Sequence, residues 1–184
     1  MSGYRPEFEE ALRMLADIST AMAERGLPRP ILVGGAAVEF YTLSAINTGD
    51  FDLCSPRQSE LEEEMQNRGF VRPSGRGRST RGWIHPALGL GFEVVGSALL
   101  DGHADPDRLV LVEHLRDGHS LAVISVEDLI ADRMGQFASG SAPEMREQAN
   151  SLLKLHPGAD LVYLERRVRH ETAGLHGAED VQDR

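Results

Sequence analysis

The chain has few of the features that covalent or membrane scaffolds require. Its 184 residues include one cysteine, Cys54, which excludes an internal disulfide framework. No apolar run approaches the length of a membrane-spanning helix, and the first residues lack the apolar core of a secretory signal. We therefore expect a cytoplasmic protein that makes no membrane contact.

Common catalytic signatures are absent as well. The sequence contains no Gly-x-x-x-x-Gly-Lys-Ser/Thr loop and no Gly-x-Gly-x-x-Gly fingerprint, so neither a P-loop nor a Rossmann site is supported. It has no Gly-x-Ser-x-Gly elbow, and its seven histidines lack the spacing of a zinc site. Nucleophilic-serine and zinc-hydrolase chemistry are therefore not expected.

Positive charge is in deficit, with 19 Lys and Arg against 29 Asp and Glu and a net charge of −10. This balance argues against broad, sequence-independent binding of nucleic acid, which depends on neutralising phosphates. One segment, Arg68 to Arg81, runs the other way and carries five arginines with no acid. It is either a solvated loop or a basic arm, in which Arg76 and Arg78 hold a triphosphate or an RNA end by bidentate contacts.

Apolar periodicity and capping signals predict helices and strands that alternate before the chain turns wholly helical. The expected helices cover residues 6–25, 35–45, 57–68, 143–155 and 159–171, with another that begins at Ser125-Val-Glu-Asp128. The expected strands cover residues 30–34, 50–54, 82–85, 90–96, 109–113 and 120–124. This α+β pattern predicts an α/β core over 1–124, a helical segment packed on it over 125–173, and a disordered tail over 174–184.

The stretch from Ile31 to Leu53 is the most informative part of the chain. An apolar run stops at Gly34-Gly35, a helix-compatible segment follows, and Asp50 and Asp52 then flank one apolar residue. Residues two apart on a strand share a face, so the two carboxylates should project together. They would repel each other without a cation, and a hard dication suits oxygen ligands. The glycines would let backbone N–H groups approach a phosphate at a helix N-terminus.

This stretch resembles the signature of the DNA polymerase β-type nucleotidyltransferase superfamily, in which an apolar residue, a glycine pair and a spacer precede Asp-apolar-Asp. The resemblance implies a small mixed sheet of the polymerase β palm type, packed by helices, whose three carboxylates hold two Mg²⁺ ions. Asp50 and Asp52 would be two of these. Glu93 is the candidate third, because a charge inside an apolar strand is costly unless it is paired or metal-bound. The resemblance puts this third ligand on a later strand that a hairpin-like connection joins to the strand of Asp50 and Asp52. Thr48 matches a threonine that often lies two residues before the first aspartate.

The stretch Ser125 to Met134 resembles a second feature, found in small bacterial members linked to abortive-infection and toxin–antitoxin systems. There, a similar helix carries a lysine that contacts the nucleotide, and Arg133 occupies the matching position here. Arginine keeps the charge but presents a planar fork rather than a point. Ala36 departs from the pattern, because many relatives have a phosphate-binding serine after the glycine pair.

The resemblance implies a Mg²⁺-dependent nucleotidyltransferase that moves an NMP from an NTP such as ATP to an acceptor hydroxyl. The acceptor could be an RNA end, a protein or a small molecule. The residues expected to bind the nucleotide are Gly34, Gly35, Thr48, Arg133, Arg76 and Arg78.

A different class of function stays open, namely a catalytically decayed nucleotidyltransferase fold that acts as a nucleotide sensor or a toxin–antitoxin partner. Ala36 and the 14-residue spacer between Gly35 and Asp50 favour it, while retention of all three carboxylates counts against it. The sequence leaves open which protein partner, an antitoxin, a toxin or a second copy, the chain would have.

Overall fold

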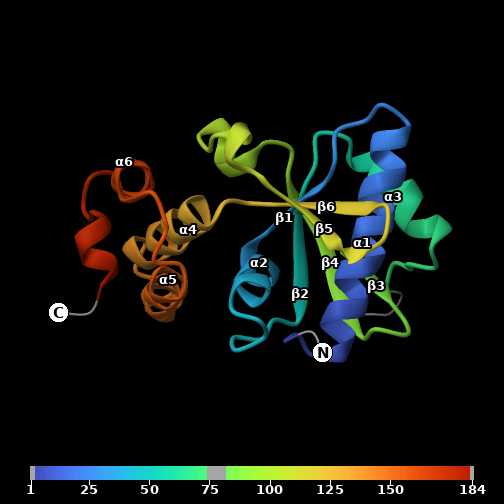
Figure 1. Ribbon diagram of the computed structural model, residues 1–184, viewed down its shortest axis with the longest axis horizontal. Coiled ribbons are helices and arrows are strands. Elements are labelled where there is room, and N and C mark those ends of the chain that lie inside the picture. The colour runs from blue at the N-terminus through green and yellow to red at the C-terminus, as the bar shows by residue number, and fades with distance from the viewer. Residues whose placement is uncertain (1–2, 74–81, 183–184) are drawn as a thin grey trace.

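A computed structural model describes residues 3–73 and 82–182 of the chain. Within these residues, helices and strands alternate and then give way to helices (Figure 1). The helices are α1 (Pro6–Glu24), α2 (Gly34–Tyr41), α3 (Gln58–Asn67), α4 (Val126–Ala138), α5 (Glu144–Leu155) and α6 (Leu161–Glu171). The strands are β1 (Ile31–Val33), β2 (Asp50–Cys54), β3 (Trp83–His85), β4 (Leu90–Gly96), β5 (Val110–Arg116) and β6 (His119–Val123). Short 3₁₀ helices are η1 (Leu99–Gly102), η2 (Pro106–Arg108) and η3 (Ala178–Val181).

The strands form one mixed sheet in the order β3-β4-β2-β1-β6-β5. Strand β1 lies at its centre, antiparallel to β2 and parallel to β6, and the outer pairs β3–β4 and β5–β6 are antiparallel. This confirms the predicted α+β class with a small mixed sheet. The pairing of β2 with β4 is parallel, whereas a hairpin-like connection was expected. The reason is that β3 intervenes along the chain and takes the antiparallel place beside β4.

Helix α1 buries one face of the sheet. Its Phe8 lies 5.1 Å from the ring of Phe51 on β2, which in turn stacks at 4.8 Å on Phe92 of β4. All three side chains are almost fully buried. Because side chains alternate along a strand, the neighbours of Phe51 point to the opposite face. The aromatic contacts therefore direct the carboxylates Asp50 and Asp52 away from α1.

The C-terminal helices lie on the other side of the sheet from α1, beyond α2 (Figure 1). Helix α4 starts at the predicted capping sequence, where the Ser125 hydroxyl accepts a bond of 3.1 Å from the Asp128 N–H. The buried Asp128 carboxylate also receives bonds from Tyr163 and Arg167 of α6, at 3.0 and 2.8 Å. This polar contact fixes α6 against α4.

Two predicted boundaries differ from the structure. The helix expected over 35–45 ends at Tyr41, because Leu43 and Ser44 adopt left-handed backbone angles, with φ of 50° and 61°. Within the tail expected to be disordered, Ala178–Val181 forms η3, whose Val181 is fully buried against α5 and α6. Among the residues that the structure describes, no helix is long and apolar enough to cross a membrane.

Candidate active site

The three predicted metal ligands lie on one face of the sheet. In the register of β2 and β4, Asp52 stands beside Glu93 and Asp50 stands beside Gly91. A Cβ at position 91 would lie 2.3 Å from an Asp50 carboxylate oxygen, so glycine is what lets Asp50 lie over β4. The strand period predicted that Asp50 and Asp52 share a face, and the register of β2 and β4 puts Glu93 on that face as well.

Burial raises the pKa of Asp52 above its ordinary value. Arg133 opposes this shift, while the negative charges of Asp50, Glu93 and Asp132 add to it. The Asp52 carboxylate therefore sits where positive charge is in short supply. That is the electrostatic setting in which a bound dication would be most stabilising.

The chemistry of these donors fits Mg²⁺, which prefers carboxylate oxygens. However, no group of three His, Cys, Asp or Glu side chains within 3–73 and 82–182 is arranged as it stands to hold a metal ion. The carboxylates share a face without being drawn together. Their convergence on one metal shell, and the two-metal site itself, therefore stay predictions.

The glycine pair has a packing role that the structure makes plain. Gly34 has φ of +62°, and a Cβ there would lie 2.1 Å from Asp52 Oδ2 and 2.9 Å from Asp52 Cβ. A Cβ on Gly35 would lie 2.8 Å from Thr48 Oγ1. The first turn of α2 therefore approaches the carboxylate strand as closely as backbone allows. Phosphate binding by Gly34, Gly35 and Thr48 remains a prediction.

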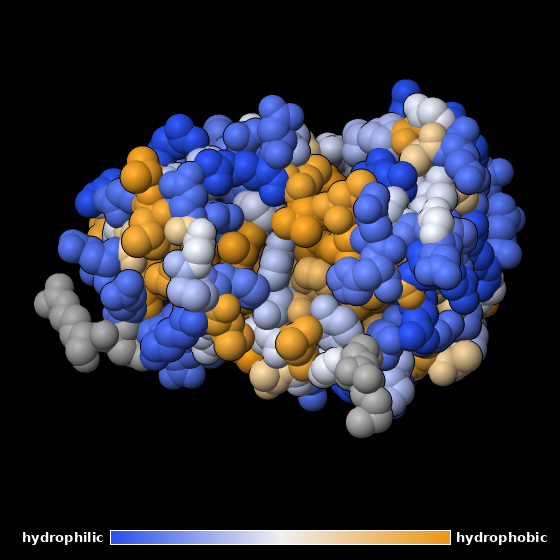
Figure 2. Space-filling model, in the orientation of Figure 1, coloured by the Kyte–Doolittle hydropathy of each residue, from blue (hydrophilic) through white to orange (hydrophobic). Residues whose placement is uncertain are grey.

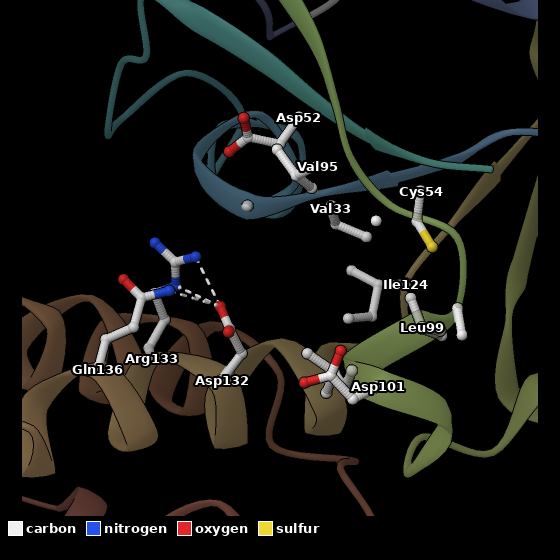
Figure 3. Close-up of a pocket in the computed structure, with 14 residues that line it drawn as sticks. Val33, Asp52, Cys54, Val95, Leu99, Asp101, Ile124, Asp132, Arg133 and Gln136 are labelled. Carbon is white, nitrogen blue, oxygen red and sulfur yellow. Dashed lines mark hydrogen bonds and ion pairs between the residues drawn. The ribbon is translucent and has the colours of Figure 1, made fainter. Parts of the chain in front are cut away.

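A cavity of about 360 Å³ lies between the sheet and α4 (Figure 3). In Figure 3, Asp52 comes from the sheet and Arg133 from the facing helix. The guanidinium of Arg133 donates to Asp132 Oδ2 at 2.6 and 3.1 Å, and its side chain is nearly buried. The structure thus brings Arg133 to the same cavity as Asp52. Its contact with a nucleotide, which the resemblance implied, stays a prediction.

Asp52 also lines a second cavity, of about 570 Å³. Asp50 and Glu93 line it together with Trp83 of β3. Asp52 is the acidic residue that lines both cavities among the described residues. Two separate ligands could therefore meet at this one carboxylate.

An apolar groove of about 480 Å³ adjoins the first cavity, and Cys54 and Leu99 line both. Leu111 of β5 is half exposed along it. Figure 2 shows hydrophobic side chains gathered near the middle of this face of the molecule, where β1, β5 and β6 come together in Figure 1. The carboxylate face of the sheet is thus continued by an apolar surface.

Of the arginines in the arginine-rich segment, the described residues include only Arg68 and Arg72. Arg76 and Arg78 lie outside the described residues. Arg68 pairs with Glu64, and Arg72 pairs with Glu62 at 2.8 Å while it lies over the Trp83 ring at 4.7 Å. These two arginines are therefore held by structural ion pairs, whereas the nucleotide-binding role of Arg76 and Arg78 stays a prediction.

Sequence reasoning missed several residues that shape the site. Glu39 of α2 is fully buried and pairs with Arg5, which precedes α1. A glutamate in the apolar run Ala36–Phe40 was the signal that could have revealed it. Asp101 also lines the first cavity, but it sits in η1 with φ of 54°, a conformation that nothing in the sequence announces.

Comparison with solved structures identifies the fold. An antigenic nucleotidyltransferase-like protein from Paracoccidioides brasiliensis superposes with a TM-score of 0.62 at 14% identity, over 94% of this chain and 88% of that one. The solution structure of the antibiotic-resistance factor ANT(2'')-Ia gives a TM-score of 0.58 at 16% identity, over 89% of this chain and 92% of that one. Its crystal structure in complex with adenylyl-2''-tobramycin gives 0.58 at 17%, over 89% and 98%.

The sequence itself matches no protein-family model and no curated protein. At the identities above, the structural likeness establishes a shared fold and leaves the activity to be argued from the site.

Proposed function

We propose that this chain, which has the fold of the nucleotidyltransferases compared above, transfers an NMP from an NTP to the hydroxyl of an acceptor in a Mg²⁺-dependent reaction. The observation that carries the proposal is that Asp52 lines two cavities. One cavity contains Arg133 and the glycine turn, while the other contains Asp50 and Glu93. A group transfer needs two substrates to meet at one point, and this carboxylate supplies such a point.

Each cavity suits one substrate. The first takes the NTP, because Arg133 can exchange its bond to Asp132 for phosphate oxygens and the N-terminus of α2 favours negative charge. The second takes the acceptor, whose hydroxyl must reach the α-phosphorus beside Asp52. The residues of this chain bind and orient the two substrates, and in-line attack then forms the new P–O bond as pyrophosphate leaves.

Asp50, Asp52 and Glu93 would hold the Mg²⁺ ions. When bound, Mg²⁺ neutralises the charge that develops on the phosphoryl oxygens and lowers the pKa of the acceptor hydroxyl. The carboxylates also accept the proton that the hydroxyl releases.

The charges favour a small acceptor that carries amines over an RNA end. Three carboxylates line the second cavity, and the chain as a whole has a net charge of −10. The comparison structure of ANT(2'')-Ia, which shares this fold, is a complex with adenylyl-2''-tobramycin. Protein side chains and RNA remain the other acceptor classes to be assayed.

A second candidate function is a non-catalytic nucleotide sensor or toxin–antitoxin partner. One observation favours it, namely that the described acids do not form a ready-made metal-binding group. Such a protein would bind NTP without transferring any part of it.

One experiment separates the two. The protein is incubated with each NTP labelled at the α-phosphate, Mg²⁺, and in turn an amino-sugar panel, total RNA and the protein alone. Label transfer that requires Mg²⁺ and is lost in Asp52→Asn supports the enzyme. Saturable NTP binding with no transfer to any acceptor supports the sensor and contradicts the enzyme.

A further inference from the structure

We infer that the ion pair between Arg5 and the buried Glu39 positions Asp50 and thereby sets the metal affinity of the site, although neither residue belongs to the site. The inference deepens the proposed function and rests on it, because it assumes that Asp50 is a metal ligand. Neither Arg5 nor Glu39 lines the two cavities that meet at Asp52. Their effect must therefore pass through the chain between α2 and β2.

The Glu39 carboxylate connects Arg5 to the segment between α2 and β2. Its side chain is fully buried and accepts four bonds: from Arg5 Nε at 2.6 Å, Arg5 Nη2 at 3.0 Å, Ser44 Oγ at 2.9 Å and the Thr48 N–H at 2.6 Å. Removing a carboxylate from water is costly, and an apolar pair of similar volume often gives equal or greater stability. The benefit of this ion pair is better sought in geometry than in stability.

The ion pair fixes the position of the Thr48 backbone. Its backbone N–H is bound by Glu39 and its carbonyl by Arg5, so both polar groups of its backbone are held by the ion pair. Its hydroxyl donates to the Asp50 carbonyl at 3.0 Å and accepts from the Asp50 N–H at 3.3 Å. An unbroken series of contacts therefore runs from Arg5 to the backbone of Asp50.

The connection between α2 and β2 needs such support. Leu43 and Ser44 hold left-handed backbone angles that cost free energy for residues with a Cβ. Ser44 is fixed by its bond to Glu39 and by a bond of 3.1 Å from the Arg5 N–H. Asp50 is exposed and is the first residue of β2, whereas Asp52 lies inside the strand and is flanked by Val33 and Glu93. Loss of the ion pair should thus move Asp50 and spare Asp52.

The test compares Glu39→Gln with Glu64→Gln as a matched control. Glu64 is also a nearly buried carboxylate bound by two arginines, Arg25 and Arg68, but it lies on α3 and lines neither cavity. For each protein, three quantities are measured: the melting temperature, the Kd for Mn²⁺ in the absence of nucleotide, and amide hydrogen exchange at Thr48 and Asp50. A merely structural ion pair would change the melting temperature alone.

We expect Glu39→Gln to weaken Mn²⁺ binding about tenfold, the scale of lost outer-shell support, and to speed exchange at Asp50. Glu64→Gln should lose melting temperature and keep its Mn²⁺ affinity. If Glu39→Gln does not fold, Thr48→Val breaks the last link while the ion pair remains, and it should weaken Mn²⁺ binding in the same direction.

The positioning role is overturned if these variants bind Mn²⁺ as the wild type does, and the proposed function then still stands. If the wild type binds no Mn²⁺, it is the proposed metal site that fails. Exchange at Asp50 still decides in that case, since unchanged protection in Glu39→Gln overturns the positioning role as well.

Discussion

At the scale of single residues, the ionisation of Asp52 gives the site a measurable signature. Because its pKa is raised in the folded state, the native protein holds this proton more tightly than the unfolded chain does. Below the ordinary pKa of 3.8, Asp52 is protonated in both states and does not lower the free energy of unfolding. As pH rises from there through the raised folded-state pKa, ionisation of Asp52 lowers the free energy of unfolding. At neutral pH and without metal, the carboxylate destabilises the fold.

We expect Asp52→Asn to be at least as stable as the wild type at neutral pH without metal, and to lose the advantage on acidification toward about pH 4. Thermal unfolding of both proteins across this range measures the difference. If the melting temperatures of the two proteins differ by the same amount at every pH, the assigned ionisation of Asp52 is contradicted.

Gly34 is the other residue with a sharp prediction. Gly34→Ala must hold φ of +62° with a Cβ and must displace Asp52, whose own Cβ would lie 2.9 Å away. Gly26 is a matched control, because it has φ of +71° and nothing within 4 Å of an added Cβ. Both variants should lose roughly 1–2 kcal/mol to the left-handed backbone. Gly34→Ala should lose roughly 1–3 kcal/mol more to the forced contact.

Urea unfolding of both glycine variants gives these values directly. Equal losses would mean that the close approach of α2 to β2 carries no strain. The carboxylate strand would then tolerate a side chain beside it.

At the scale of elements, the contact between α4 and α6 depends on Asp128. This carboxylate is buried and binds Arg167, which is also nearly buried and has Glu171 as a second partner. Asp128→Asn leaves the arginine with one partner, and breaking a buried pair costs roughly 3–5 kcal/mol. Asp160 caps the N-terminus of α6, the helix that carries Arg167, and it is more exposed than Asp128. Asp160→Ala should therefore cost about 1 kcal/mol.

Chemical denaturation of the two variants checks the ranking. If Asp160→Ala proves the more damaging, α6 is held by its cap and the buried ion pair is secondary.

The elements also show what a sequence can predict. Strands β2 and β4 were placed at their observed bounds, because their apolar residues alternate with polar ones and turn signals flank them. Helix α2 is shorter than the sequence predicts, because Leu43 and Ser44 take left-handed backbone angles and Ser44 is held there by bonds with Arg5 and Glu39. The turn η1 was missed, since Leu100 has φ of 45° without a glycine to signal it.

In the candidate site, too, the sequence predicted some features and not others. The pairing of Asp50 with Asp52 followed from the strand period, and the place of Glu93 from the cost of a charge in an apolar strand. The two cavities and the parallel pairing of β2 with β4 depend on which strands become neighbours. That choice is made by tertiary packing and leaves no local trace in the sequence.

At the scale of the whole molecule, metal binding should appear as stability. A ligand that binds the native state alone stabilises it by about 2.7 kcal/mol at a hundredfold excess over Kd. Mg²⁺ should therefore raise the melting temperature of the wild type, and NTP with Mg²⁺ should raise it further. Asp52→Asn should lose both gains.

The control for this titration is NaCl at equal ionic strength. A chain with a net charge of −10 gains some stability from screening alone. If NaCl reproduces the whole effect of Mg²⁺, the gain is not due to a specific site.

The position of Cys54 lets its alkylation rate report whether a ligand fills the first cavity or the apolar groove. It is the only thiol in the sequence, lies two residues beyond Asp52, and lines both the first cavity and the apolar groove. Burial, and to a lesser degree Asp101, raises the pKa of the thiol, so alkylation by iodoacetamide at neutral pH should be slow. A ligand seated in either space should slow it further, and the reaction rate then reads out filling of the cavity without any label on the substrate.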